Sequence, residues 1–99
     1  MIIVPKSWGE EHIIVNDEYC GKLLMLREGK QCSYHYHKVK KETFYPLWGR
    51  VLLTVEGKEF ELKEAYTLEP YTKHRFMGLT DAAILEISTH HEDADTVRL

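Results

Sequence analysis

Four side chains with metal-binding chemistry stand at short, ordered spacings and restrict this chain more than any other feature. His35 and His37 are one residue apart, and Glu42 and His74 follow them. Alternate residues of a β-strand point to the same face, so a strand would direct both histidines to one side. Three imidazoles and one carboxylate suit a divalent transition metal (zinc, manganese, nickel, cobalt or iron), with positions left open for water or substrate. The sequence therefore predicts one divalent metal at these four residues.

The composition restricts the class of protein around this site. The 99 residues are 43% hydrophobic and 29% charged, as in an ordinary globular chain, and they predict a single domain over residues 1–99. The net charge of −3 gives no electrostatic reason to expect nucleic acid, and no apolar run reaches membrane-spanning length. The first residues lack the features of a signal peptide, and two cysteines are too few for a disulfide framework. We therefore expect a cytoplasmic protein with reduced thiols.

Short β-branched and apolar segments alternate with glycine turns along the chain. Many short strands at regular spacing predict an all-β sandwich or a small barrel. The expected strands cover residues 2–4, 11–15, 21–27, 31–37, 43–47, 50–55, 59–62, 66–68, 75–77 and 82–88. Only residues 63–65 and the tail from residue 90 to 96 have any helical character.

The order of the metal-binding residues resembles two motifs of the cupin superfamily. The pattern Gly29-x5-His35-x-His37-x4-Glu42-x6-Gly49 matches the first cupin motif at every position. Pro70-x3-His74 resembles a shortened second motif, in which Thr72 replaces a glycine. The resemblance implies an all-β jelly roll, a double-stranded β-helix, with the metal held inside the mouth of the barrel.

Two further segments resemble cupins related to mannose-6-phosphate isomerase of the sugar-nucleotide type. Trp8-Gly9 resembles the opening of that group, and residues 85–89 followed by Glu92–Arg98 resemble its closing pattern, in which an acidic pair leads to an arginine. The similarity extends from about Trp8 to Arg98. It implies a small-molecule substrate, a sugar or sugar phosphate, that undergoes aldose–ketose isomerisation.

Strand periodicity predicts which side chains line the pocket, because inward and outward positions alternate. Gln31 and Ser33 share the parity of the ligand histidines, and we expect them to contact substrate or to hydrogen bond a ligand histidine. Phe44 and Phe76 take inward positions on their own strands and either ring the pocket or pack in the core. Cys32 has the opposite parity and should face away from the metal.

Tyr34 and Tyr36 have this outward parity too. A second sheet could pack on the face that they occupy, and many cupins are dimers, so we expect a homodimer.

Isomerisation also needs a base that moves a proton between neighbouring carbons. Glu86 is the best candidate, as the lone acid in an apolar strand, and Lys22 in another apolar run is a weaker one. Either side chain could instead lie on a solvated strand face. Arg98 is the cation that the family resemblance favours for a phosphate group.

Other charged and titratable residues are expected to be solvated rather than functional. Lysines 38, 40 and 41 fill the loop between the ligands, and charged loops are usually exposed. His12, His90 and His91 lie in terminal segments, where we also expect exposure.

Three functions fit this ligand set. A metal-dependent sugar isomerase is preferred, on the family resemblance. An iron-dependent dioxygenase would use the same three histidines and glutamate. A non-catalytic sugar- or metal-binding cupin is the third, because a chain of 99 residues leaves little for an elaborate substrate lid. The fold does not choose among them.

Overall fold

The computed structural model describes all residues from Met1 to Leu99 and is built almost entirely from β-strands. Eleven strands and one short 3-10 helix follow one another along the chain. Their bounds are β1 (Ile2–Lys6), β2 (Gly9–Asn16), β3 (Tyr19–Leu26), β4 (His35–His37), β5 (Glu42–Trp48), β6 (Val51–Val55), β7 (Lys58–Glu61), β8 (Tyr66–Leu68), β9 (His74–Gly78), β10 (Ala82–Thr89), the 3-10 helix η1 (Asp93–Asp95) and β11 (Thr96–Arg98).

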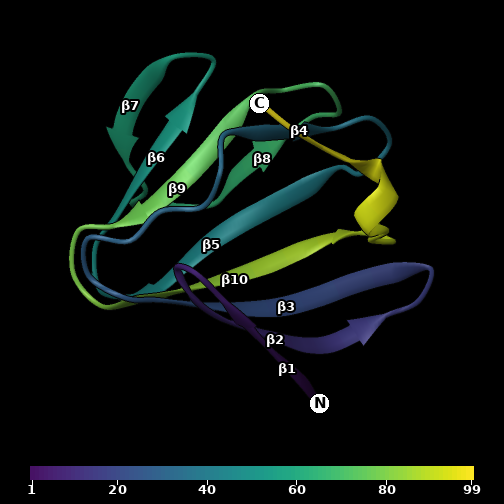
Figure 1. The fold of residues 1–99 in the computed structure, drawn as a ribbon, viewed down its shortest axis with the longest axis horizontal. Helices are drawn as coiled ribbons and strands as arrows, with labels where there is room; N and C mark the ends of the chain where they lie inside the picture. Colours follow the sequence, from purple (N-terminus) through teal and green to yellow (C-terminus); the bar gives the residue numbers. More distant parts are fainter.

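The strands form two antiparallel sheets that face each other (Figure 1). The six-stranded sheet has the order β1-β2-β3-β10-β5-β8, and the five-stranded sheet has the order β11-β4-β9-β6-β7. Consecutive strands often belong to different sheets, so that β4 leads into β5 and β10 leads into β11 by crossing between the layers. This arrangement confirms the prediction of an all-β jelly roll.

The core lies between the two sheets and is built by alternation along each strand. In β3 every second side chain is buried, starting at Cys20, as expected for a strand with one face on the core. Phe44, Leu53, Phe76 and Ile84 belong to a cluster of 13 buried apolar residues drawn from both sheets. The Trp8 ring packs edge-on against Phe76 with ring centroids 5.0 Å apart, which is a favourable aromatic geometry.

The turn between β6 and β7 shows how local sequence fixes one hairpin. Glu56 has a φ of 48° and Gly57 has a φ of 80°, so both central residues adopt left-handed backbone. Two positive φ values define the type I′ turn, whose twist matches that of the flanking strands. This hairpin joins two of the strands expected from the sequence, residues 50–55 and 59–62.

Two segments differ from the sequence prediction. The ligand strand was expected over residues 31–37, but regular pairing begins only at His35, and before it the chain meets β9 through an isolated bridge between Gln31 and Met77. The tail contains the additional strand β11, which pairs with β4 and which polar residues 90–95 gave no reason to expect. Residues 63–65 are not helical, and the tail holds only the single turn η1. None of the helical structure has the length and apolar character needed to cross a membrane.

Candidate metal centre and its pocket

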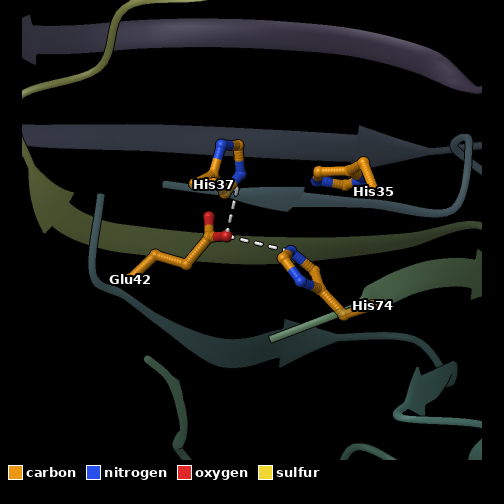
Figure 2. Close-up of side chains that lie close together, drawn as sticks. All are labelled: His35, His37, Glu42 and His74. Carbon is orange, nitrogen blue, oxygen red and sulfur yellow. Dashed lines mark ion pairs between the residues drawn. The ribbon is translucent and has the colours of Figure 1, made fainter. Parts of the chain in front are cut away.

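Three strands from the two sheets bring the four predicted ligands together (Figure 2). His35 and His37 point the same way from β4, and His74 stands directly opposite His35 in the β4–β9 pairing. Glu42 comes from the start of β5 in the other sheet. One ligand atom from each residue lies within 4.8 Å of those from the other three. The cluster is therefore compatible with a single divalent metal.

The carboxylate of Glu42 forms the centre of this cluster. Its Oε2 lies 3.0 Å from His74 Nε2 and 3.1 Å from His37 Nε2. Both Glu42 Oε2 and His74 Nε2 are buried without a hydrogen-bond partner. Buried polar atoms without partners are costly, and a bound cation would satisfy both of them.

The second ring nitrogen of each histidine has its own partner in the protein. His35 Nδ1 lies 2.7 Å from the Ser33 carbonyl oxygen, and His74 Nδ1 lies 2.8 Å from that of Thr72. His37 Nδ1 lies 3.2 Å from Thr96 Oγ1. Donation by Nδ1–H to these oxygens leaves Nε2 as the free nitrogen that faces the cluster. Metal-binding histidines are commonly oriented in this way.

The protonation states also suit a metal. Burial, together with the neighbouring His74, lowers the pKa of His35 to about 4, so its ring is neutral near pH 7. Burial acts to raise the pKa of Glu42, but the adjacent His37 and His74 side chains and the nearby Lys40 ammonium hold it well below its ordinary value. A neutral imidazole and an ionised carboxylate are the forms that bind metal.

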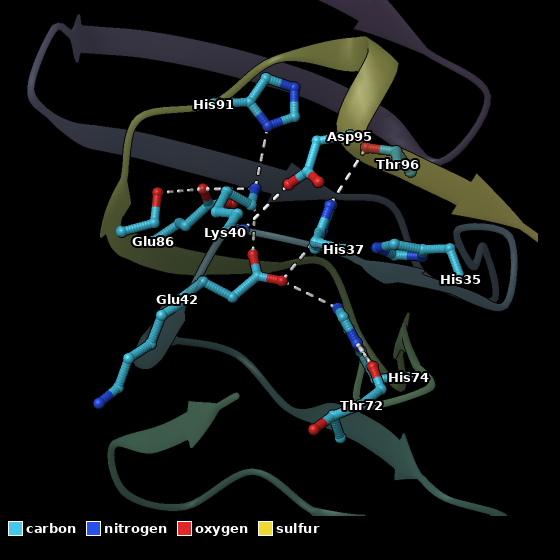
Figure 3. A network of polar contacts seen from close by, with 12 residues as sticks. His35, His37, Lys40, Glu42, Thr72, His74, Glu86, His91, Asp95 and Thr96 are labelled. Carbon is cyan, nitrogen blue, oxygen red and sulfur yellow. Dashed lines mark hydrogen bonds and ion pairs between the residues drawn. The ribbon is translucent and has the colours of Figure 1, made fainter. Parts of the chain in front are cut away.

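A second polar network adjoins the cluster and is centred on Lys40 (Figure 3). The Lys40 ammonium lies 3.1 Å from Glu86 Oε2, 3.3 Å from Glu42 Oε1 and 3.0 Å from His91 Nδ1. Burial opposes the charged form, but the two carboxylates outweigh it and raise the pKa of Lys40. The expectation of a solvated loop is wrong for Lys40, which is only 3% exposed, whereas Lys38 and Lys41 are exposed.

Both candidates for a base point inward. Glu86 is 3% exposed, and burial together with the Glu42 charge raises its pKa. Its Oε2 also accepts a hydrogen bond from Ser88 Oγ at 3.0 Å. Lys22 is 1% exposed and forms an ion pair with Glu11 Oε2 at 3.4 Å. Neither side chain lies on a solvated strand face.

A cavity of about 230 Å³ connects these groups. It is lined by His35, His37 and Glu42, by both base candidates, and by four of the five residues expected to contact substrate, which are Ser33, Phe44, Phe76 and Arg98. Phe44 and Phe76 also belong to the buried core, so each ring lies both in the core and along the cavity. Arg98 is exposed on β11, at the rim.

The fifth expected contact, Gln31, does not reach the cavity. Its side chain is exposed, and its backbone bridges to Met77. Cys32 is buried instead, with Sγ accepting a hydrogen bond from Phe76 N, and burial raises the pKa of its thiol to about 12. Strand parity therefore gave the wrong inward residue, because the strand does not extend back to residue 31.

The terminal histidines differ in their surroundings. His90 is exposed as expected, but His12 is half-buried beside Glu10 and His91 lines the cavity. The His91 ring accepts from Lys40 and lies 2.9 Å from Asp93 Oδ1. The expectation of exposed side chains is therefore wrong for His12 and His91.

Sequence reasoning missed four residues that build the site, namely Lys40, His91, Asp95 and Thr96. Lys40, His91 and Asp95 act through contacts between the loop after β4 and the segment before β11, and Thr96 of β11 contacts His37 of β4. These contacts join residues that lie 51 to 59 positions apart in the chain, so no local spacing marks them. The acidic pair in the tail was noticed only as part of a family resemblance.

Comparison with known proteins gives sugar isomerases as relatives in sequence. No protein-family model matches the chain. The D-lyxose/D-mannose isomerase of Thermosediminibacter oceani is 33% identical over 82% of this chain and 61% of that protein. The D-lyxose ketol-isomerase of Cohnella laeviribosi is 34% identical over 81% of this chain and 60% of that protein. The chain thus spans about three fifths of the length of these relatives.

Solved structures agree on the architecture. The capsular polysaccharide assembling protein CapF of Staphylococcus aureus matches 99% of this chain with a TM-score of 0.85, 16% identity and 31% of its own length. KdgF of a Halomonas species matches 95% with a TM-score of 0.79, 15% identity and 96% of its own length. A sugar phosphate isomerase of the cupin superfamily from Silicibacter pomeroyi matches 83% with a TM-score of 0.73, 19% identity and 59% of its own length. The two-sheet architecture and these matches show that the chain has the cupin fold.

Proposed function

We propose that this protein is a divalent-metal-dependent aldose–ketose isomerase that acts on a small sugar. One observation carries the proposal: three residues of the metal cluster, His35, His37 and Glu42, line the same cavity as the buried carboxylate of Glu86. The proteins similar in sequence are named as D-lyxose and D-mannose isomerases, and this supports the choice of reaction.

The residues divide the chemistry between them. Aldose–ketose isomerisation moves one proton between C1 and C2 of the open-chain sugar through an enediol and a second proton between the two attached oxygens, and no other reactant is consumed. A divalent metal held by His35, His37, Glu42 and His74 would supply Lewis-acid polarisation of the sugar carbonyl. Glu86 takes the proton from one carbon and returns it to the other, and its raised pKa brings it closer to the working pH of a general base.

The size of the cavity limits the substrate. Sites for drug-sized ligands usually measure about 300–1,000 Å³. The cavity of about 230 Å³ is smaller, and Phe44 and Phe76 close its inner end. These dimensions support a five- or six-carbon sugar rather than a nucleotide sugar.

Two cations at the rim bear on whether the sugar carries a phosphate. Arg98 and Lys6 line the cavity, and no carboxylate forms an ion pair with either. They support a mannose-6-phosphate isomerase-like activity. A sugar phosphate is therefore assayed as well, after the free sugars that the names of the relatives give.

The test begins with metal analysis of the untagged protein, followed by assays of the metal-loaded protein on D-lyxose, D-mannose and mannose 6-phosphate. Glu42→Gln is the matched control that keeps the side-chain shape and removes the charge. Turnover of an aldose by the wild type but not by the variant is the expected result. Tight sugar binding without turnover would instead indicate a binding protein. Oxygen consumption with iron would indicate a dioxygenase.

The homodimer, the cytoplasmic location and the single domain stay predictions. The outer face of the six-stranded sheet adds support for the dimer, because Tyr45, Trp48 and Ile87 are each about half exposed there. Apolar sheet faces of this kind are often covered by a partner. Light scattering of the purified protein tests this prediction, and a monomeric mass would contradict it.

A further inference from the structure

Two connections between the sheets meet beside the metal cluster. The first is the β4–β5 loop, residues 38–41, and the second is the β10–β11 segment, residues 90–95. The Asp95 carboxylate joins them by accepting the backbone amides of Lys38, Val39 and Lys40 at 2.9 to 3.0 Å. This contact fixes the backbone of the loop, and it directs the Lys40 side chain inward from a segment that would otherwise be exposed.

The Lys40 ammonium makes two hydrogen bonds and one further ion pair inside the protein. Its partners are Glu42 Oε1 on β5, Glu86 Oε2 on β10 and His91 Nδ1 in the β10–β11 segment. An ammonium group has three donors and no acceptor, and here it faces three protein groups. We therefore expect Lys40 to act through the groups that it contacts rather than on substrate directly.

Each carboxylate that Lys40 contacts is left with one oxygen free for another task. On Glu42, Lys40 takes Oε1, while Oε2 faces His37 and His74. On Glu86, Lys40 and Ser88 both contact Oε2, so Oε1 accepts no hydrogen bond from the protein. One cation thus sets the rotation of a candidate metal ligand and of the candidate base at the same time.

We propose that Lys40 is a positioning residue that orients Glu42 toward the metal and Glu86 toward the sugar. The base half of this proposal rests on the proposed function, whereas the metal half does not. A purely structural alternative exists, because buried ion pairs can often be replaced by neutral side chains of similar volume without loss of stability. The test must therefore separate orientation from charge balance.

The design uses Co²⁺ as the probe and compares three variants. Lys40→Met removes the ammonium but leaves Glu86 buried and unpaired. The double variant Lys40→Met/Glu86→Gln removes one positive and one negative charge, so the net charge around the metal is preserved and both side chains keep their length. Lys41→Met is the matched control, because Lys41 is its exposed neighbour and pairs only with the exposed Glu69.

The expected result is a 10–100-fold weaker Co²⁺ affinity in the double variant, the range typical for loss of a residue that orients a metal ligand. The visible absorption of bound Co²⁺ should also change, since a released Glu42 carboxylate can rotate. Lys41→Met should leave both readouts unchanged. In the single variant Lys40→Met, loss of a positive charge alone would strengthen cation binding, so a weaker Co²⁺ affinity in that variant cannot come from charge.

Equal Co²⁺ affinity and equal spectra in the wild type and the double variant would overturn the proposal, because Lys40 would then only neutralise Glu86. Failure of the double variant to fold would overturn it too, since Lys40 would then serve the fold. Failure of the proposed function has a different signature, in which the wild type binds Co²⁺ normally but converts no sugar.

Discussion

The two sheets contribute different chemistry to the same cavity. The five-stranded sheet supplies only imidazoles, from His35 and His37 on β4 and His74 on β9. The six-stranded sheet supplies the charged groups, with Glu42 on β5 and Glu86 on β10. A neutral imidazole needs one acceptor to be buried, and a backbone carbonyl or hydroxyl provides it here. A buried carboxylate needs a cation or several donors.

This difference explains why the connections between the sheets matter more for the carboxylates of the site than for its histidines. The histidines are satisfied almost entirely within their own sheet, but the carboxylates depend on Lys40, which arrives from the β4–β5 loop. Lys22 and Glu11 make a second pair within the six-stranded sheet. We infer that the imidazole side of the site is preformed by strand pairing. The carboxylate side is instead held by the β4–β5 loop and the β10–β11 segment, which are called the crossing segments below.

Removing one ligand from each sheet tests whether both are required. His35→Ala and Glu42→Gln should each strongly weaken metal binding and abolish turnover, because each removes one of the four ligand groups. Metal content after dialysis is the measurement, with His12→Ala as the control, since the side-chain hydrogen bond of His12 is to Glu10 and not to a ligand. If only the histidine variant lost metal, the carboxylate would not be a ligand and the site would belong to one sheet.

Glu86→Gln sharpens the comparison within the six-stranded sheet. Its kcat should fall by about 10²–10⁴-fold, the usual contribution of a general base, while one equivalent of metal is retained. The side chain keeps its shape and its contacts with Lys40 and Ser88. Steady-state kinetics beside metal analysis provide the two readouts, and Glu18→Gln on the surface is the control. Unchanged turnover would mean that another residue acts as the base, and Lys22 would be the next candidate.

Glycine substitutions compare how tightly the two sheets are built. A Cβ on Gly9 would lie 1.8 Å from the Met25 carbonyl oxygen in the six-stranded sheet. Gly9→Ala should therefore lower the free energy of unfolding by about 3 kcal/mol, since neither strand can move freely. A Cβ on Gly57, in the β6–β7 hairpin, would have nothing within 4 Å. Alanine there should therefore lower the free energy of unfolding only by the strain of its left-handed backbone, about 1–2 kcal/mol. Urea denaturation measures both, and equal losses would show that the close approach at Gly9 is not real.

The sequence predicted the imidazole side of the site better than the carboxylate side, for a physical reason. Strand alternation and short spacing are local properties, and they placed His35 and His37 on one face. The same rule failed for Gln31, because it assumes an unbroken strand and pairing starts at His35. It also could not decide the orientation of Glu86, since burial of that carboxylate depends on Lys40, which is 46 positions away.

The all-β jelly roll was predictable because many short segments carry the same signal, so an error in one strand does not change the fold. The strand β11 was missed because its register depends on pairing with β4 rather than on its own composition. Long-range polar contacts such as Asp95 with the β4–β5 loop have no pattern in sequence.

Asp95→Asn is the mildest test, because it loosens the crossing segments without touching the cavity. Burial acts to raise the pKa of Asp95, but the three backbone amides outweigh it and hold the pKa below its ordinary value. A carboxylate with a depressed pKa stabilises the fold fully above its unfolded pKa, near 4, and loses this contribution as pH falls through the folded pKa. The variant should therefore lose about 1 kcal/mol of stability at neutral pH, and this difference should shrink as pH falls below about 4. Urea denaturation across this pH range is the measurement, and Asp17→Asn on the surface is the control. A difference that stays constant with pH would mean that the Asp95 charge does not hold the loop, and that the crossing segments are joined by backbone shape alone.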